Sequence, residues 1–171
     1  IIEASIRAGK HVLSQKPFVL DLDEGQRLVD LADKHGVRLA VNQNGRWAPH
    51  FSYIREAVRS GVIGQVSAAH LAVHWDHTWV AGTEFENVKH LILYDFAIHW
   101  FDILRCIMGG RTPLRVYASM TRPSWQTVDP PLFAHAVVDY GDAQASLVFD
   151  GQCGYGQRDI TRIVGSEGTL T

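Results

Sequence analysis

A lysine, an aspartate and a histidine are the residues of this chain whose types and spacing could do chemistry. Lys16 ends a short apolar run and directly precedes Pro17, which favours an extended backbone at the lysine. Asp95 and His99 are four residues apart in a mostly apolar stretch, so on a helix they would be one turn apart. Imidazole titrates near neutral pH and can take a proton from an alcohol. These residues predict an enzyme that moves a proton at a substrate hydroxyl.

Asp102 extends the pair into a polar stripe, because steps of four and three residues return to nearly the same angle around a helix. Burying three polar groups on an apolar helix costs free energy unless they are paired or useful. Two interpretations remain open from the residues alone. The stripe is either part of an active site, or a structural network in which Asp102 holds His99 or Arg105 neutralises a carboxylate.

Two further polar residues follow a second predicted strand. Asn42 and Arg46 come directly after the apolar run at residues 37–41, and ligands of α/β proteins bind at the carboxyl ends of such strands. The same residues could instead form a hydrogen-bonded turn around Gly45. Asn42 and Arg46 are therefore candidates for ligand binding.

Trp75 and His77 could line a site for a sugar-like ligand, or simply pack at the end of a strand. The nearby histidines invite a metal interpretation. His70 and His74 would share one face of a strand but be roughly 13 Å apart, at about 3.3 Å per residue, which is too far to share one ion. We therefore predict no metal site, and a metal-dependent lyase or isomerase built around His74, His77 or His90 is only a distant alternative.

The elements that must position these residues change character along the chain. The first part alternates between helix and strand, with strands at residues 10–14 and 37–41 and a helix between Asp21 and Gly36. This alternation indicates a parallel sheet covered by helices. Another helix is predicted from Pro49 to just before Gly61.

The second part has the pattern of an antiparallel sheet. Residues 66–75 alternate, with Leu71, Val73 and Trp75 on one face. A long buried helix is predicted at residues 88–108, followed by four strands that pair antiparallel in succession, at residues 114–121, 133–140, 143–149 and 158–164. The fold class is therefore α/β plus α+β, with one domain at residues 1–62 and a second at residues 63–171.

Composition limits the function classes. With 46% hydrophobic and 20% charged residues, the chain reads as an ordinary globular protein. Its net charge of -2 provides no basic surface for nucleic acid, and charged residues interrupt the longest apolar stretch, so no membrane partner is predicted. Cys106 and Cys153 suggest neither a zinc site nor a disulfide framework, so a reducing cytoplasm is the expected location.

The order of the motifs resembles the Gfo/Idh/MocA family of NAD(P)-dependent oxidoreductases. The resemblance rests on the run GKHVLSQKP ending at Pro17, then Asn42 to Arg46, then Asp95, His99 and Asp102, and finally GSEGTL at residues 165–170. It implies the C-terminal part of a Rossmann-type domain, followed by a domain with an open, mainly antiparallel sheet and a long buried helix. It also implies that the glycine-rich phosphate turn precedes residue 1 and that the sheet continues past Thr171. We therefore expect the chain alone to be inactive and unable to bind the dinucleotide.

The resemblance assigns roles to the candidate residues. It makes His99 the acid or base, Lys16 a partner of the substrate oxygen and nicotinamide, and Asp95 a substrate ligand. Gln15 departs from the family, which usually has glutamate before the Lys-Pro pair, and this removes a charge. The implied contacts of NAD or NADP are Gln15, Lys16, Pro17 and Asn42, and those of a sugar, polyol or related hydroxy compound are Arg46, Trp75, His77 and Asp95.

A different class of function also fits the sequence. The chain could be a non-catalytic binding or assembly module whose open sheet pairs with a second copy, in which case Lys16 and His99 would matter for stability only. The resemblance likewise implies a homo-oligomer formed through the open sheet.

Overall fold

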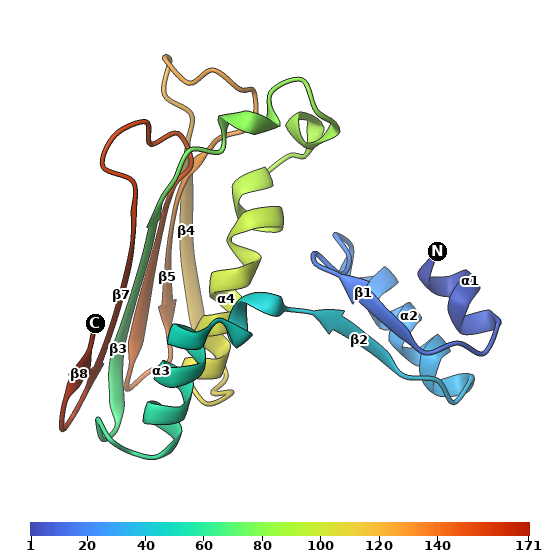
Figure 1. Cartoon of the computed structure of the whole chain (residues 1–171), viewed down its shortest axis with the longest axis horizontal. Helices are drawn as coiled ribbons and strands as arrows, with labels where there is room; N and C mark the ends of the chain where they lie inside the picture. Colours follow the sequence, from blue (N-terminus) through green and yellow to red (C-terminus); the bar gives the residue numbers. More distant parts are fainter. The chain divides into compact units, whose positions relative to one another are not determined.

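The computed structural model describes all 171 residues, which form two compact units, Ile1–Asn44 and Gly45–Thr171 (Figure 1). The units divide earlier than the domain boundary expected at residue 62. The reason is that helix α3 (Pro49–Arg59) buries Ile54 in the hydrophobic core of the second unit. The division into domains at residues 1–62 and 63–171 remains a prediction.

The first unit consists of two parallel strands and two helices. Helices α1 (Ile2–Arg7) and α2 (Leu22–Lys34) pack against β1 (Val12–Gln15) and β2 (Leu39–Asn42), and Ile6, Ala32 and Val37 form its buried core. As predicted, α2 begins at Asp21, whose carboxylate accepts hydrogen bonds from the backbone N–H groups of Asp23 and Glu24 at 2.8 and 3.0 Å. The strands pair in parallel register and place Gln15 opposite Asn42.

The second unit is built on a six-stranded sheet with helices on one face (Figure 1). Its strands lie in the order β4 (Arg115–Thr121), β5 (Phe133–Asp139), β6 (Gln144–Asp150), β3 (Val66–His74), β7 (Arg158–Gly165) and β8 (Thr169–Leu170). The helices are α3 and α4 (Ile98–Ile107), with 3-10 turns at Asn44–Trp47, Thr78–Val80 and Glu84–Asn87.

The predicted antiparallel succession of the last four strands is wrong at its end. β4, β5 and β6 pair antiparallel in turn, but β3 lies between β6 and β7, so that Leu71 pairs with Leu147 in parallel and with Thr161 in antiparallel register. The physical reason is that alternating burial is the same for a parallel and an antiparallel partner. The sequence pattern therefore identifies the strands without fixing their neighbours.

The long buried helix predicted at residues 88–108 is shorter and divided. A π-helical turn covers Ile92–Phe96, and α4 starts only at Ile98. One side of this helical segment is buried, with Trp100, Leu104 and Ile107 in the core, whereas Tyr94 and Arg105 are exposed. No helix of the chain is long and apolar enough to cross a membrane.

The two faces of the sheet differ, as the alternation predicts. The inner face carries buried side chains such as Leu71, Val73, Leu147 and Phe149, which pack against α3, α4 and the π-helical turn. The outer face carries polar and half-buried side chains such as His70 and Val148. No helix of this unit covers the outer face (Figure 1).

Candidate active site

In the first unit, the candidate cofactor residues gather at the carboxyl ends of the two parallel strands. Gln15 and Asn42 are register partners at this edge, and Lys16 and Pro17 follow β1 directly, joined by a cis peptide bond. The side-chain oxygen of Gln15 accepts a hydrogen bond from the backbone N–H of Lys16 at 3.2 Å. The structure therefore brings all four residues to one edge of the sheet.

Asp95 and His99 belong to the second unit, where the π-helical turn meets α4. Both residues are half-buried, and the buried neighbours Phe96 and Ala97 fix the backbone between them. Single π-turns occur frequently at functional sites because they alter the direction of a side chain within a helix. The acid and the imidazole therefore lie on a helical segment whose backbone is irregular at the acid.

The backbone at Gly45 comes close to His99. A Cβ atom at Gly45 would lie 3.4 Å from Nδ1 of His99 and 3.6 Å from Cδ1 of Ile103. The backbone at Gly45 therefore lies close to the imidazole, and even a Cβ atom there would be in ordinary van der Waals contact with it. Gly45 is part of the wall of the candidate site.

Asp102 is paired with Arg46. The Nε atom of Arg46 donates to Asp102 at 2.8 Å, and its Nη2 atom forms a second, short contact with the same carboxylate. The hydrogen bonds to Asp102 raise the pKa of Arg46 above its ordinary value. Arg46 is thus a partner of Asp102 that the sequence analysis did not consider. The role of Arg46 in substrate binding remains a prediction.

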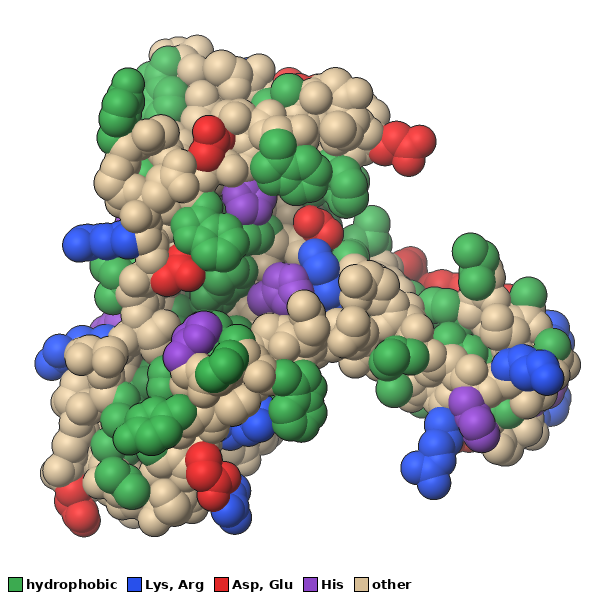
Figure 2. Space-filling model, in the orientation of Figure 1, with side chains coloured by type: hydrophobic (Ala, Val, Ile, Leu, Met, Phe, Trp, Pro, Cys, Tyr) green, Lys and Arg blue, Asp and Glu red, His purple; other side chains and the backbone are tan.

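Trp75 and His77 lie among aromatic side chains beside α4. The ring of Trp75 is 5.5 Å from that of Phe96 and 5.8 Å from that of Trp100, while the ring of His77 is 3.9 Å from Phe96. His99 contacts the same group, with its ring 6.1 Å from Trp100. The rings of Phe96 and Trp100 therefore connect Trp75, His77 and His99. Figure 2 shows histidine and acidic side chains among hydrophobic ones in the middle of this unit.

Asp159 of β7 is a site residue that sequence reasoning missed. Its side chain accepts a hydrogen bond from Trp75, and it faces a cavity of about 430 Å³ that His50 and Phe51 also line. Partial desolvation raises the pKa of the Asp159 carboxyl, against the opposing effects of the Trp75 N–H and of His50 and His74. Its signal in the sequence is a charged residue at an inward position of β7, two residues before Thr161 and four before the buried Ile163.

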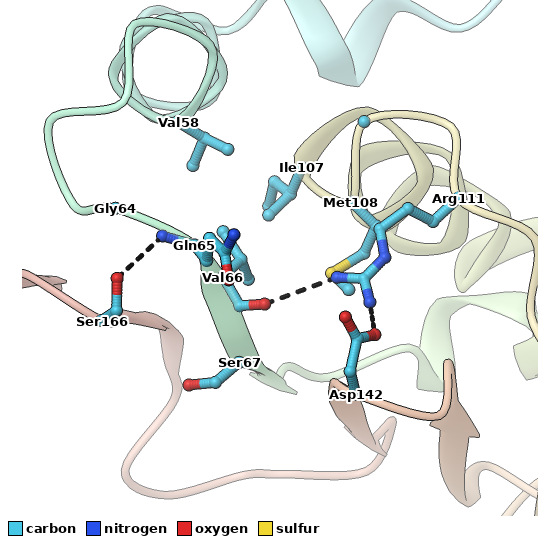
Figure 3. Close-up of a pocket in the computed structure, with 11 residues that line it drawn as sticks. Val58, Gly64, Gln65, Val66, Ser67, Ile107, Met108, Arg111, Asp142 and Ser166 are labelled. Carbon is cyan, nitrogen blue, oxygen red and sulfur yellow. Dashed lines mark hydrogen bonds and ion pairs between the residues drawn. The ribbon is translucent and has the colours of Figure 1, made fainter.

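A second cavity, of about 460 Å³, lies away from all the candidate residues. It is bordered by the start of β3 and the ends of α3 and α4, where Arg111 forms an ion pair with Asp142 and donates to the carbonyl of Val66 at 3.5 Å (Figure 3). The backbone N–H of Gln65 donates to the hydroxyl of Ser166 at 3.0 Å on its other side. Because the charges that line this cavity are paired, it has no group poised for chemistry.

The two histidines of β3 form hydrogen bonds with side chains of β6 on the outer face of the sheet. His70 contacts the hydroxyl of Ser146 at 2.7 Å, and His74 contacts the carboxylate of Asp150 at 2.6 Å. No group of three histidine, cysteine, aspartate or glutamate side chains has the arrangement of a metal site.

Each of the two units matches a known protein family. Residues 1–43 match the oxidoreductase family with an NAD-binding Rossmann fold, and residues 51–171 match the GFO/IDH/MocA C-terminal domain. The chain belongs to the Gfo/Idh/MocA family of oxidoreductases.

Two of the relatives are named for a specific enzyme activity. The chain is 30% identical to the scyllo-inositol 2-dehydrogenase (NADP(+)) of Bacillus subtilis over 84% of its own length and 40% of the relative. It is 28% identical to the D-apiose dehydrogenase of Paraburkholderia graminis, over 99% of its own length and 46% of the relative. A probable dehydrogenase from Thermotoga maritima has the same fold, with a TM-score of 0.86 and 26% identity over 99% of this chain and 52% of that one. The chain spans about half the length of these relatives.

Proposed function

We propose that this chain is the part of an NAD(P)-dependent oxidoreductase that carries the acid–base residues and most of the substrate site. The reaction is hydride transfer between the nicotinamide and a CH–OH group of a sugar, inositol or other polyol. The observation that carries the proposal is the position of Asp95 in the π-turn and of His99 at the start of α4, with the imidazole beside the ring of Trp100.

The residues at the strand edge of the first unit fit a nicotinamide nucleotide. Gln15 and Asn42 offer neutral amides, and the side-chain oxygen of Gln43 is buried with no hydrogen-bond partner, which leaves an acceptor for a ligand's N–H or O–H group. The carboxyl edge of parallel strands is where α/β proteins bind such ligands. When bound, the cofactor supplies the carbon that accepts or returns the hydride.

The chemistry of the chain's own residues follows from their acidity. His99 takes the proton of the substrate hydroxyl when the alcohol is oxidised, and returns it to the oxygen in the reverse direction. Asp95 accepts a hydrogen bond from a substrate hydroxyl and so orients the ring. The ammonium of Lys16 donates to the reacting oxygen and stabilises negative charge there.

The substrate class is suggested by the aromatic and acidic lining of the second unit and by the relatives. Trp75 and His77 present rings, while Asp159 presents a carboxylate held by Trp75. Hydroxyl-rich rings use both kinds of group, one for their C–H faces and the other for their O–H groups. Two relatives are named as dehydrogenases of scyllo-inositol and of D-apiose, and both compounds are hydroxyl-rich.

A chimera tests the proposal. This chain would replace the half of the Thermotoga maritima dehydrogenase that it matches, and the purified chimera would be assayed with NAD⁺ and NADP⁺ against inositols, pentoses and hexoses. We expect reduction of the nicotinamide, and a loss of roughly 10²–10⁴-fold in kcat in His99→Asn, with NADH binding retained. His35→Asn, at the exposed end of α2, is the matched control. A chimera that binds NADH but oxidises none of these compounds, or an active His99→Asn variant, would contradict the proposal.

A further inference from the structure

Aromatic rings form a continuous series from the core of the second unit to its surface. Ring centroids are 5.8 Å apart between Trp100 and Trp75, 6.3 Å between Trp75 and His77, 6.2 Å between His77 and Trp79, and 5.6 Å between Trp79 and Phe85. Trp100 is 7% exposed, Trp75 37% and Trp79 56%. We call these five residues the aromatic ladder. Its inner end is at the ring of His99, and its outer end is open to solvent.

The outer end of the ladder is held in place by its neighbours. Val80, next to Trp79, is buried in a separate cluster with Leu91, Val128 and Leu132. The carboxylate of Glu86, next to Phe85, accepts hydrogen bonds from the backbone N–H groups of Gly82 at 2.8 Å and Asp129 at 3.3 Å. The exposed rings therefore sit on an anchored loop, so a ligand would bind them with little ordering cost.

The two outermost rings present an angled apolar surface. The planes of Trp79 and Phe85 meet at 71°, and both side chains are exposed. Adjacent exposed aromatic rings form a contiguous apolar patch, and such patches often mark ligand-binding sites. The faces of such rings carry negative charge density, which attracts the C–H groups on one side of a sugar ring.

The polar groups around the ladder favour a neutral, hydroxyl-rich ligand. The hydroxyl and backbone N–H of Thr78 hold the pKa of Asp76 below its usual value, so Asp76 carries a charge that accepts hydrogen bonds from hydroxyls. Glu84 and Glu86 add negative charge to the same loop. Phosphate-bearing ligands such as nucleic acids would be repelled here.

We propose that the outer end of the ladder is a second sugar-ring subsite, formed by Trp79 and Phe85. In this arrangement the reacting sugar ring lies against Trp75 and His77, and a second sugar ring stacks on Trp79. Only the placement of the reacting ring rests on the proposed function. Trp75 and Trp79 both neighbour the ring of His77, at 6.3 and 6.2 Å, so one ligand with two linked sugar rings could contact both tryptophans. The substrate class then extends to glycosides and disaccharides, which would bind more tightly than a single sugar ring.

Binding measurements without cofactor test this inference separately from catalysis. The 171-residue chain would be titrated with glucose, myo-inositol, maltose, cellobiose and sucrose, and the dissociation constants determined by NMR or calorimetry. We expect at least one disaccharide to bind more tightly than glucose, and Trp79→Ala to weaken that disaccharide by roughly two- to tenfold while leaving glucose unchanged. Phe85→Ala should act in the same direction.

Trp125→Ala is the matched control, because Trp125 is also exposed and contacts one ring, Phe133, but lies outside the ladder. The proposal is overturned if disaccharides bind no better than glucose, if no carbohydrate binds, or if Trp79→Ala and Trp125→Ala have equal effects. A failure of hydride transfer in the chimera would leave these binding results intact, so the two proposals can fail independently.

Discussion

Among individual residues, the ion pair between Arg46 and Asp102 holds the turn at Gly45 on the helix that carries His99. The side chain of Asp102 is only 11% exposed and that of Arg46 is 31% exposed, so the pair is partly shielded from water. The carboxylate is bonded by two guanidinium nitrogens, a geometry that is stronger than a single contact. This pair therefore stabilises the wall of the candidate site.

We predict that Asp102→Asn lowers the free energy of unfolding by about 1–3 kcal/mol, because it leaves the Arg46 charge partly buried without its counter-ion. Urea denaturation followed by circular dichroism measures the change. Glu56→Gln is the control, since its partner Arg59 and Glu56 itself are both largely exposed, and we expect no measurable effect there. Equal unfolding curves for wild type and Asp102→Asn would show that the pair does not stabilise this unit.

The sequence alone identified some residues of the candidate site but not others. Lys16, Asp95 and His99 could be identified because their types and local spacing already suggest chemistry. The partner of Asp102 could not be identified, because Arg46 lies 56 residues away and only the fold brings the two together. Asp159 was missed for a related reason, since its importance comes from a hydrogen bond with Trp75, which directly follows the neighbouring strand β3.

At the level of elements, the π-helical turn Ile92–Phe96 carries Asp95, and His90 lies two residues before it. His90 is the only residue other than glycine with a positive φ, at 63°. Its Nδ1 atom is buried with no hydrogen-bond partner. Both features cost free energy, and such costs concentrate at functional segments.

We predict that His90→Asn keeps the stability of the chain, because asparagine tolerates the left-handed conformation. His90→Val should lower the free energy of unfolding by about 1–3 kcal/mol, because a β-branched residue is strained at this φ. The two variants can be compared by urea denaturation. A valine variant as stable as the asparagine variant would mean that the positive φ is not required for the π-turn.

The sequence predicted which helices and strands exist better than it predicted which strands pair. Capping at Asp21, glycine at helix ends and alternating burial are local signals, and the corresponding helices and strands are present close to the expected bounds. The π-turn was not predicted, because its apolar residues fit an ordinary helix equally well. The place of β3 between β6 and β7 was not predicted either, because strand pairing depends on distant partners.

For the whole molecule, the most prominent unassigned surface is the outer face of the six-stranded sheet. It carries half-buried Val137 and Val148 beside exposed Tyr117, in a frame of polar and charged side chains. A mixed apolar and polar face of this kind resembles a protein–protein interface. The face is continuous over several strands, and a stable pair of subunits typically buries about 800 Å² from each partner.

We propose that two copies of the chain associate through this outer face, and we expect sedimentation equilibrium to give the mass of a dimer. Val137→Glu should shift the population to monomer, because two like charges would be buried in the centre of a symmetric interface. Val62→Glu provides the control, since Val62 is exposed and lies outside the sheet. The expected circular dichroism of both variants is that of the wild type. A wild-type chain that remains monomeric at all concentrations would exclude association through this face, and a dimer that survives Val137→Glu would assign the contact to another surface.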